Sequence, residues 1–264
     1  MLGGMASFCG IPTTTTREPQ GGFCIKSYLL ADMGTLYSVA LPIGHALDMS
    51  WRAKEILEKV EIIACEDSRK ARDWFRRIGV KPTGQLLAYH SYNEHMLAPQ
   101  IVEKLRQGKN VALIADAGTP RLCDPGYVLL KLCWENKLPV KPVPGPSALT
   151  ALLSVAPMPV FPLLFLGFLP SKSAARKNQL SQYQNFVGTI ALYESRHRLQ
   201  EMLADLREIL GESPVFIGRE LTKDHEEFFW GSLGEAITWS VGKRGEFVML
   251  LDRHNKIGKV LNLA

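Results

Sequence analysis

The stretch Asn110–Gly126 reads NVALIADAGTPRLCDPG and predicts a buried strand followed by a polar turn. Val111–Ala115 is an unbroken apolar run, as expected of a strand that is covered on both faces. Asp116, Gly118 and Thr119 follow at its carboxyl end, where open α/β sheets bind their ligands. A carboxylate beside a glycine, which lets a backbone approach a ligand closely, favours a site for a polar small molecule. A tight strand-to-helix turn with a capping aspartate is the competing explanation.

The last residues of the same stretch predict the start of a helix. Asp124 followed by Pro125 is a common helix start, because the aspartate accepts an otherwise unpaired N–H group and proline has none to pair. We therefore expect a helix from this point to about Trp134.

Outward from this stretch, apolar runs and helical patterns alternate from residue 35 to about residue 156. The expected strands are Leu36–Leu41, Val60–Cys65, Leu86–Tyr89 and Pro139–Val143, and the expected helices are Ser50–Lys59, a basic helix after Glu66–Arg69 through Arg77, Glu94–Gln107 and one that ends at Val155. Strands that alternate with helices predict a mostly parallel sheet with helices on both faces. Residues 35–156 are therefore interpreted as an N-terminal α/β lobe.

Pro157, Pro159 and Pro162 interrupt this pattern and mark a boundary. Further strands and helices follow up to Leu251, so residues 157–254 are interpreted as a C-terminal α/β lobe. Two α/β lobes joined by a proline-rich hinge predict a cleft between them, where ligand pockets are preferentially found.

The two ends of the chain differ from these lobes. Residues 1–34 contain four consecutive threonines (Thr13–Thr16), paired glycines and scattered prolines, without helical or strand periodicity. We interpret them as a disordered extension or an upstream start, with Met33 as an alternative start. No basic segment precedes an apolar core there, which argues against a secretory signal. Residues 255–264 are interpreted as a tail.

Composition and charge permit several classes of protein. The chain has 264 residues, 46% of them hydrophobic, and a net charge of +5. That charge permits a nucleic-acid partner without demanding one. No apolar run approaches the roughly 20 residues that span a bilayer, so we expect no membrane partner.

The five cysteines are odd in number, scattered and without a C-x-x-C pair. This pattern argues against a disulfide framework and against a zinc site, and it favours reduced thiols in the cytoplasm. We expect no metal, and we expect Cys65 and Cys123 to be small core residues.

Nine short motifs, taken in order, resemble one family. They are LPIGHALDMS, CEDSR, LAYHSYNE, ADAGTPRLCDPG, PVPGPSAL, GFLPSK, YESRHRL, GRELTK and GEF, and they run from about Leu36 to Leu251. In this order they resemble the bacterial ribosomal RNA small subunit methyltransferase I family, part of the tetrapyrrole-methylase-like superfamily of S-adenosylmethionine (SAM) enzymes. The resemblance implies two α/β lobes of the tetrapyrrole-methylase type with the SAM cleft between them. It also implies 2′-O-methylation of a cytidine in the decoding region of 16S rRNA, on the assembled 30S subunit, by a homodimer.

The resemblance further implies a set of SAM-binding residues from both lobes: Pro42, Ile43, Gly44, Asp116, Gly118, Thr119, Ser147, Ala148, Tyr193 and Leu221. Asp116 and Thr119 would contact the cofactor, and Gly118 would let the backbone approach it. Ser147 and Ala148, at a helix N-terminus, would offer a hydroxyl group and free N–H groups to the methionine carboxylate.

A ribose hydroxyl is a poor nucleophile at neutral pH, so this reaction favours a base that accepts its proton. The candidates are Glu194, His197 and Glu220, which all lie in second-lobe motifs. An ordinary ion pair or a helix cap is the competing explanation for each, and the resemblance does not decide among them.

Basic side chains gather in the same second-lobe motifs: Lys172, Arg176, Lys177, Arg196, His197, Arg198, Arg219 and Lys223. Clustered cations favour contact with RNA phosphates, so this set is the expected RNA surface. For Arg176 and Lys177 taken alone, a solvated helix face is the competing explanation.

Four positions depart from the motifs usual in the family. Leu41 replaces a threonine, His45 an asparagine, Ala115 a serine and Arg196 a proline. We expect the first three to line the SAM pocket, and they leave open a SAM-binding or ribosome-binding relative with weakened catalysis. Kinship of fold alone also leaves open a small-molecule methyltransferase of the tetrapyrrole type, against which the basic second lobe argues.

Overall fold

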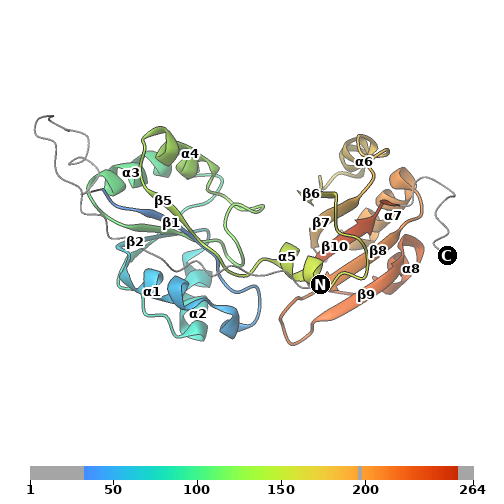
Figure 1. Ribbon diagram of the computed structural model, residues 1–264, viewed down its shortest axis with the longest axis horizontal. Coiled ribbons are helices and arrows are strands. Elements are labelled where there is room, and N and C mark those ends of the chain that lie inside the picture. Colours follow the sequence, from blue (N-terminus) through green and yellow to red (C-terminus); the bar gives the residue numbers. More distant parts are fainter. Residues whose placement is uncertain (1–32, 196–197, 255–264) are drawn as a thin grey trace, which may run out of the picture. The chain divides into compact units, whose positions relative to one another are not determined.

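The computed structural model describes residues 33–195 and 198–254 (Figure 1). Most of the expected N-terminal extension (residues 1–32), the expected tail (255–264), and Arg196 and His197 lie outside the described residues. Within them the chain forms two five-stranded sheets, each with helices packed on it, so the predicted two-lobed α/β fold is confirmed.

The first sheet is entirely parallel, as the sequence predicts. Its strands are β1 (Leu36–Val39), β2 (Ile62–Cys65), β3 (Gln85–Ala88), β4 (Val111–Leu113) and β5 (Val140–Val143), in the order β3-β2-β4-β1-β5. The middle strand, β4, is buried at every position because both faces of the sheet are covered. The residues after β4 are therefore flanked by the carboxyl ends of β1 and β2.

Helices cover both faces of this sheet (Figure 1). They are the short helix η1 (Ala46–Asp48), α1 (Trp51–Lys59), α2 (Ser68–Ile78), α3 (Glu94–Arg106) and α4 (Tyr127–Glu135). Leu57 of α1 and Phe75 of α2 belong to one core cluster, whereas Ile101 of α3 and Leu129 of α4 belong to another. Because buried side chains recur on one side of each helix, the polar residues of α1 to α3 are left in solvent.

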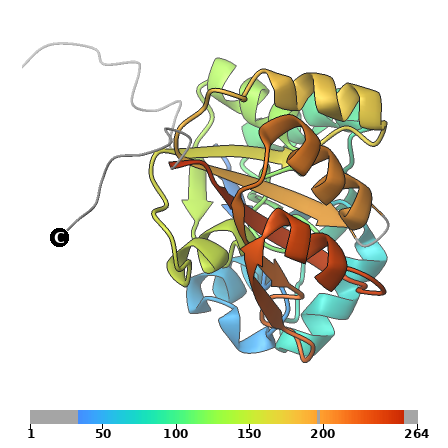
Figure 2. The same cartoon turned by 90° about the vertical axis from the view of Figure 1, so that its right-hand side faces the viewer.

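The second sheet is mixed. Its strands are β6 (Leu163–Phe168), β7 (Thr189–Ser195), β8 (Pro214–Arg219), β9 (Glu227–Ser232) and β10 (Glu246–Asp252), in the order β6-β7-β10-β8-β9. Only the β6–β7 pair is parallel. Figure 2 shows α6 (Ser173–Ser181), α7 (Leu199–Leu210) and α8 (Leu233–Trp239) on one face of this sheet. Leu180, Leu206 and Leu233 bury that face in a single core cluster.

Packing assigns α5 (Ala148–Ser154) to the second sheet. Leu149 and Leu152 of α5 share a core cluster with Ala191 of β7 and Leu250 of β10. The lobes therefore divide before α5, earlier than the expected boundary at residue 157. The three prolines instead lie in the connection from α5 to β6.

The first lobe also begins earlier than expected. The backbone N–H group of Gly34 donates to the carbonyl oxygen of Leu105 at 2.8 Å. A Cβ atom at Gly34 would lie 1.9 Å from the carbonyl oxygen of Lys109, so only glycine fits there. Met33 packs against the core cluster that contains α3. Both residues therefore belong to the fold, not to the extension.

A search of residues 33–195 and 198–254 finds no helix with the length and apolar character that crossing a membrane requires.

Candidate active site

A cavity of about 330 Å³ lies where the carboxyl ends of the first sheet meet β7 and β10 of the second. Its wall comes from the loops after β1, β2, β4 and β5 and from the ends of β6, β7 and β10. Seven of the expected cofactor residues line it: Ile43, Asp116, Gly118, Thr119, Ser147, Ala148 and Tyr193. The volume is within the range usual for small-molecule sites.

The turn after β4 is tied to two neighbouring loops. Gly118 and Leu41 exchange backbone hydrogen bonds, with N–O distances of 2.9 and 3.1 Å. The Thr119 hydroxyl group donates to the carbonyl oxygen of Pro146 at 3.0 Å. Gly118 has a φ of +71°, and a Cβ atom there would lie 3.2 Å from Cγ2 of Ile43. These ties fix the turn as one wall of the cavity, with little room for a side chain at Gly118.

Three carboxylates and a lysine share this wall. Lys70 Nζ lies 2.6 Å from Asp116 Oδ2. Burial, reinforced by the charge of Asp116, raises the pKa of Glu66. Burial and the charges of Glu66 and Asp116 raise the pKa of Asp124 to about 7. Because these carboxylates repel one another, a cationic ligand beside them would be stabilised.

The cavity wall also holds the hydroxyl groups of Ser147 and Tyr193. Ser147 is only 9% exposed. Burial raises the pKa of Tyr193, and a hydrogen bond with the Ser147 hydroxyl group acts against this larger effect to lower it. The hydroxyl of Tyr193 accepts the N–H group of Leu149 at 3.2 Å. Tyr193 therefore takes one of the N–H groups that we expected to be free at this helix end, and its hydroxyl group also interacts with that of Ser147.

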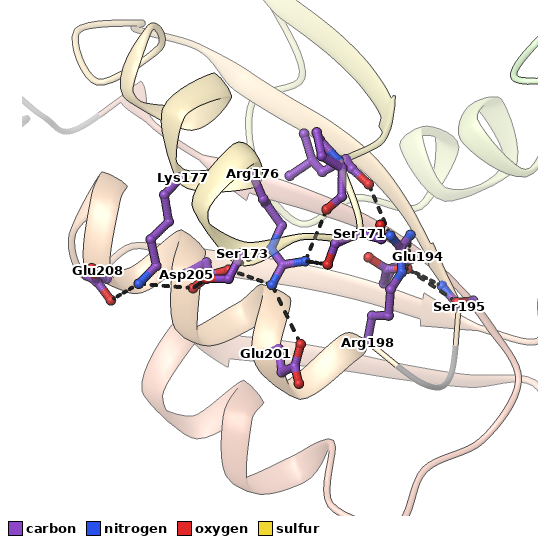
Figure 3. Close-up of polar contacts among 12 residues, drawn as sticks. Ser171, Ser173, Arg176, Lys177, Glu194, Ser195, Arg198, Glu201, Asp205 and Glu208 are labelled. Carbon is purple, nitrogen blue, oxygen red and sulfur yellow. Dashed lines mark hydrogen bonds and ion pairs between the residues drawn. The ribbon is translucent and has the colours of Figure 1, made fainter.

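Glu194 is a buried carboxylate in the cavity wall, near the end of β7 (Figure 3). Its side chain is 0% exposed. Oε1 accepts from Arg198 Nη2 at 2.7 Å and from the N–H group of Ser195 at 2.7 Å. Oε2 has no partner among the described residues. A buried acceptor left unpaired is unfavourable, so Oε2 is suited to a donor from a ligand.

Glu220, another expected candidate for the base, lies outside the cavity lining. Its Oε1 atom accepts from the N–H group of Glu246 at 2.7 Å and from Lys223 Nζ at 3.1 Å. Burial acts to raise the pKa of Glu220, but these two contacts outweigh it and lower the pKa. The structure therefore places Glu220 in an ion pair that supports a turn. His197, the third candidate, lies outside the described residues.

Pro42, Gly44 and Leu221 also lie outside the lining. A Cβ atom at Gly44 would lie 2.5 Å from Cγ of Lys223 and 2.9 Å from the carbonyl oxygen of Leu221. Leu221 is 7% exposed and packs in a core cluster with Leu152. Gly44 and Leu221 therefore hold the loop after β1 against the second lobe.

The expectation that Leu41, His45 and Ala115 line the pocket is wrong. Leu41 and Ala115 are 0% and 3% exposed in the core. His45 is exposed, and its Nδ1 atom accepts the N–H group of Leu47 at the start of η1. These departures from the family motifs consequently change no side chain of the cavity wall. The fourth, Arg196, lies outside the described residues.

The expectation that Arg176 contacts RNA is also wrong. The competing explanation, that Arg176 lies on a solvated helix face, is wrong as well (Figure 3). Its side chain is 0% exposed. Nε donates to Asp205 Oδ2 at 2.6 Å, and Nη1 donates to the carbonyl oxygens of Pro170 and Ser171. A phosphate cannot reach a guanidinium group that is enclosed in this way.

Most of the other cations expected to contact RNA have internal partners. Lys177 Nζ lies 2.7 Å from Glu208 Oε2, Arg198 pairs with Glu194, Arg219 with Glu227, and Lys223 with Glu220 and Glu246. Lys172 is exposed, and it is the one member among the described residues without such a pair. The positive charge of this set is thus largely balanced within the second lobe.

Several cavity residues were not expected from the sequence: Glu66, Lys70, Leu122, Cys123, Asp124, Phe168, Ser195 and Glu246–Val248. Most of them lie in the motifs quoted above, and their place in a motif was the sequence signal that could have identified them. Asp124 was expected to cap a helix, but α4 begins at Tyr127 with Gly126 as its N-cap.

Cys123 is exposed and not a core residue, whereas Cys65 is buried as expected. No cluster of three or more His, Cys, Asp or Glu side chains suited to a metal ion occurs in residues 33–195 and 198–254.

Comparison with known proteins identifies the family. The family profile of tetrapyrrole (corrin/porphyrin) methylases matches residues 35–237. The chain is 39% identical to the ribosomal RNA small subunit methyltransferase I of Leptospira biflexa over 226 residues, which cover 85% of this chain and 93% of that protein. It is 38% identical to the Escherichia coli O157:H7 protein of the same name, over 87% of this chain and 82% of that protein. The chain belongs to the ribosomal RNA small subunit methyltransferase I family.

Solved structures agree on the fold. The methyltransferase CobJ superimposes with a TM-score of 0.64 at 16% identity and covers 83% of this chain and 94% of its own. Uroporphyrin-III C-methyltransferase from Thermus thermophilus, complexed with S-adenosylhomocysteine, gives a TM-score of 0.60 at 16% identity over 85% of this chain and 100% of its own. At this level of identity they show the tetrapyrrole-methylase fold and nothing more specific.

The methyltransferase I family depends on SAM, and the cavity of this chain fits such a ligand. SAM carries a sulfonium cation, an amino group and a carboxylate. The carboxylates Glu66, Asp116 and Asp124 face the cavity, which suits the cationic groups. The hydroxyl groups of Ser147 and Tyr193 line the cavity and could donate to an anionic group. The position of Gly118 has little room for a side chain, and because glycine has none, the backbone there could approach the ligand closely.

Proposed function

We propose that this protein transfers a methyl group from SAM to the ribose 2′-hydroxyl group of a cytidine in the decoding region of 16S rRNA. The observation that carries the proposal is the match to ribosomal RNA small subunit methyltransferases I over most of both chains, at 38–39% identity. A match that covers 85–87% of this chain extends over most of both lobes.

Two alternatives receive less support. The tetrapyrrole methyltransferases match at only 15–17% identity, which is evidence of a shared fold and not of a shared substrate. The reading as a relative with weakened catalysis depended on pocket substitutions. Leu41, His45 and Ala115 lie outside the cavity lining, so these substitutions no longer support weakened catalysis.

The proposed cofactor site consists of the cavity residues Ile43, Asp116, Gly118, Thr119, Ser147, Ala148 and Tyr193. Asp116 and its neighbours would accept hydrogen bonds from the cofactor, and Ser147 would donate one. Gly44 and Leu221 lie behind this wall and hold the loop after β1 in place.

SAM supplies an electrophilic methyl group on a sulfonium sulfur. The protein must hold a ribose hydroxyl group in line with it, exclude water and accept the hydroxyl proton. We assign the last task to Glu194, because its Oε2 atom is buried, unpaired and part of the cavity wall. Arg198 keeps this carboxylate oriented through Oε1. When the bond between the methyl group and the sulfonium sulfur breaks, S-adenosylhomocysteine would leave and the ribose oxygen would gain the methyl group. Oε2 of Glu194 would accept the hydroxyl proton and later release it to solvent.

The substitution Glu194→Gln tests this assignment. An amide oxygen cannot take up the proton, so methyl transfer to 30S subunits is expected to fall by about 10²- to 10⁴-fold. SAM affinity, measured by calorimetry, is expected to stay within about twofold of the wild type. Glu220→Gln is the matched control, because Glu220 lies outside the cavity. Normal transfer by Glu194→Gln would exclude Glu194 as the base.

The proposed function has a separate test. Ribose methylation of 16S rRNA is mapped in cells with and without the gene, and again after the purified protein is added to subunits from the cells that lack it. One cytidine 2′-O-methyl group is expected to disappear and then return. An unchanged map in both comparisons would contradict the function, whatever the result for Glu194.

We further propose that the protein acts in the cytoplasm, where ribosomal subunits are its substrate, and that it acts as a homodimer. Phe228 and Trp230 are 45% and 46% exposed on β9, which lies at one edge of the second sheet. Exposed aromatic side chains on an edge strand favour self-association. Sedimentation is expected to give a dimer for the wild type and a monomer for Trp230→Glu. A monomeric wild type would contradict this.

A further inference from the structure

Helix α2 carries the largest excess of positive charge on any helix that the structure describes. Its sequence, SRKARDWFRRI, contains five cationic side chains and one carboxylate, Asp73. Ala71 and Phe75 lie four residues apart and are buried in the first-lobe core. The cationic side chains consequently lie on the remaining surface of the helix, and all of them are exposed: Arg69, Lys70, Arg72, Arg76 and Arg77.

The exposure of the cations themselves separates them from the paired cations of the second lobe. The side chains of Arg69, Lys70 and Arg76 are 85%, 62% and 78% exposed. The paired second-lobe cations Lys177, Arg198, Arg219 and Lys223 are only 30%, 24%, 19% and 31% exposed. Arg69 pairs with Asp67, and its side chain is 85% exposed. Arg76 pairs with Asp73, and both side chains are more than 60% exposed. Ion pairs in solvent contribute little free energy, so a phosphate group can replace their carboxylates. Arg77 lies over the ring of Trp74, at 5.0 Å from its centre.

The helix starts at the active site and continues away from it. Lys70, in its first turn, lines the cavity and binds Asp116 at 2.6 Å. With 11 residues, α2 is about 16 Å long. A strand whose target nucleotide enters the cavity would therefore meet cations over several neighbouring phosphates.

Two more features of the first lobe suit a nucleic acid. A second hollow, of about 570 Å³, lies between α2 and β3, and Arg72 and Arg76 line it together with Phe75 and Gln85. Tyr92 follows β3 at the same edge of the sheet as the cavity, and it is 97% exposed. Exposed aromatic rings and exposed cations on one lobe are the two kinds of group that bind single-stranded nucleic acid, by stacking and by charge.

We propose that the exposed face of α2, together with Tyr92, holds the single-stranded RNA that flanks the target nucleotide. This inference rests on the proposed function, because it identifies where that substrate lies. It moves the RNA surface from the second lobe, where the paired cations are largely covered, to the first lobe, where the cations of α2 are exposed to solvent.

The test removes three cations that take no part in the cavity wall. Arg72→Ala, Arg76→Ala and Arg77→Ala are combined, since alanine preserves a helix. The matched control is Lys104→Ala, Arg106→Ala and Lys109→Ala, which removes the same charge at exposed positions in and after α3. Affinity for 30S subunits and for a 12-nucleotide oligocytidine is measured across a salt series, and SAM affinity and melting temperature are measured in parallel.

The α2 variant is expected to lower the salt slope of RNA affinity by about 2, which corresponds to three lost phosphate contacts on a single strand. Its SAM affinity is expected to match that of the control. Tyr92→Ala is expected to weaken binding about 5- to 150-fold, and Tyr92→Phe to leave it within about twofold.

Three results would overturn the inference. They are an unchanged salt slope, equal losses in the α2 variant and the control, and a loss on subunits without one on oligocytidine. The last would indicate that α2 binds a ribosomal protein. Failure of the wild type to methylate 16S rRNA would instead contradict the proposed function, so the two failures are distinguishable.

Discussion

Asp116 is the residue whose role depends most directly on its neighbours in the cavity. It forms an ion pair with Lys70 across 2.6 Å, and its side chain is 27% exposed. A carboxylate in this position can hold the lysine, a cationic ligand or both. The turn that carries it is fixed by the hydrogen bonds of Gly118 and Thr119, so removing the carboxylate should not unfold the turn.

Asp116→Ala is expected to weaken SAM binding about ten- to a hundredfold while the protein stays folded. The reason is the loss of a charged hydrogen-bond acceptor, which contributes about 1.5–3 kcal/mol. Calorimetry measures the affinity, and Asp73→Ala, an exposed carboxylate on α2, is the control. If Asp116→Ala binds SAM as the wild type does, the carboxylate serves only the ion pair with Lys70.

The raised pKa of Asp124 predicts that the stability of the fold depends on pH. Burial and the neighbouring carboxylates raise its pKa from 3.8 to about 7 in the folded state. Between about pH 4 and 7 the folded protein therefore binds more protons than the unfolded chain, and this group lowers stability as pH rises through that window. Asp124→Asn is expected to remove that loss.

The free energy of unfolding of Asp124→Asn relative to the wild type is therefore expected to rise by on the order of 1–2 kcal/mol between pH 4 and pH 8, after allowance for partial exposure. Urea denaturation at several pH values measures it. Asp73→Asn, exposed on α2, should show no such trend. A constant difference across this range would show that Asp124 titrates normally.

Helices α6 and α7 are joined by the buried pair of Arg176 and Asp205 (Figure 3). Arg176 is 0% exposed and Asp205 is 6% exposed. The Ser173 hydroxyl also donates to Asp205, at 3.0 Å. A buried pair of this kind holds two elements in one arrangement, but removing one partner leaves an unpaired charge.

Asp205→Ala is expected to lower the free energy of unfolding by about 3–5 kcal/mol. The double change Arg176→Met with Asp205→Leu is expected to recover most of that loss, since no charge is left buried. Urea denaturation compares both with Glu208→Ala, which removes an exposed partner of Lys177 and should change stability by less than about 1 kcal/mol. Equal effects of Asp205→Ala and Glu208→Ala would contradict the role of the buried pair.

At the scale of the whole molecule, the packing of Met33 and Gly34 against the first lobe determines how many N-terminal residues can be deleted. The lack of apolar periodicity before them predicts that residues 1–32 are dispensable. Deletion of residues 1–32 is expected to leave the melting temperature and SAM affinity unchanged.

Deletion of residues 1–34, with a new methionine before Thr35, is expected to lower the melting temperature by several degrees. It removes the packing of Met33 and places a side chain where Gly34 meets the backbone of Lys109. Calorimetric melting of both shortened proteins beside the full chain is the measurement. A clear drop for the 1–32 deletion would show that the extension stabilises the fold.

Much of the fold followed from local patterns. The apolar runs around β1, β2 and β4 were predicted as strands of a parallel sheet because a strand that is buried on both faces has to be apolar. The turn ADAGTP was predicted as a ligand site from its place after such a strand, and it lines the cavity. The expected boundary between the lobes was too late, because a seven-residue apolar helix such as α5 carries no sign of which sheet it covers.

By itself, the sequence determined the family, the two-lobed α/β fold and the loops that surround the cavity, since periodicity and turn chemistry are local and motifs keep their order along the chain. Only the tertiary structure decided which charges are free. The partner of Arg176 lies 29 residues away in α7, and the partners of Arg219 and Lys223 come from β9 and β10. The energy of a charge depends on its burial and on what lies within a few ångströms, and neither can be read from neighbours in sequence. For that reason the balanced cations of the second lobe and the solvent-exposed cations of α2 looked alike in the sequence.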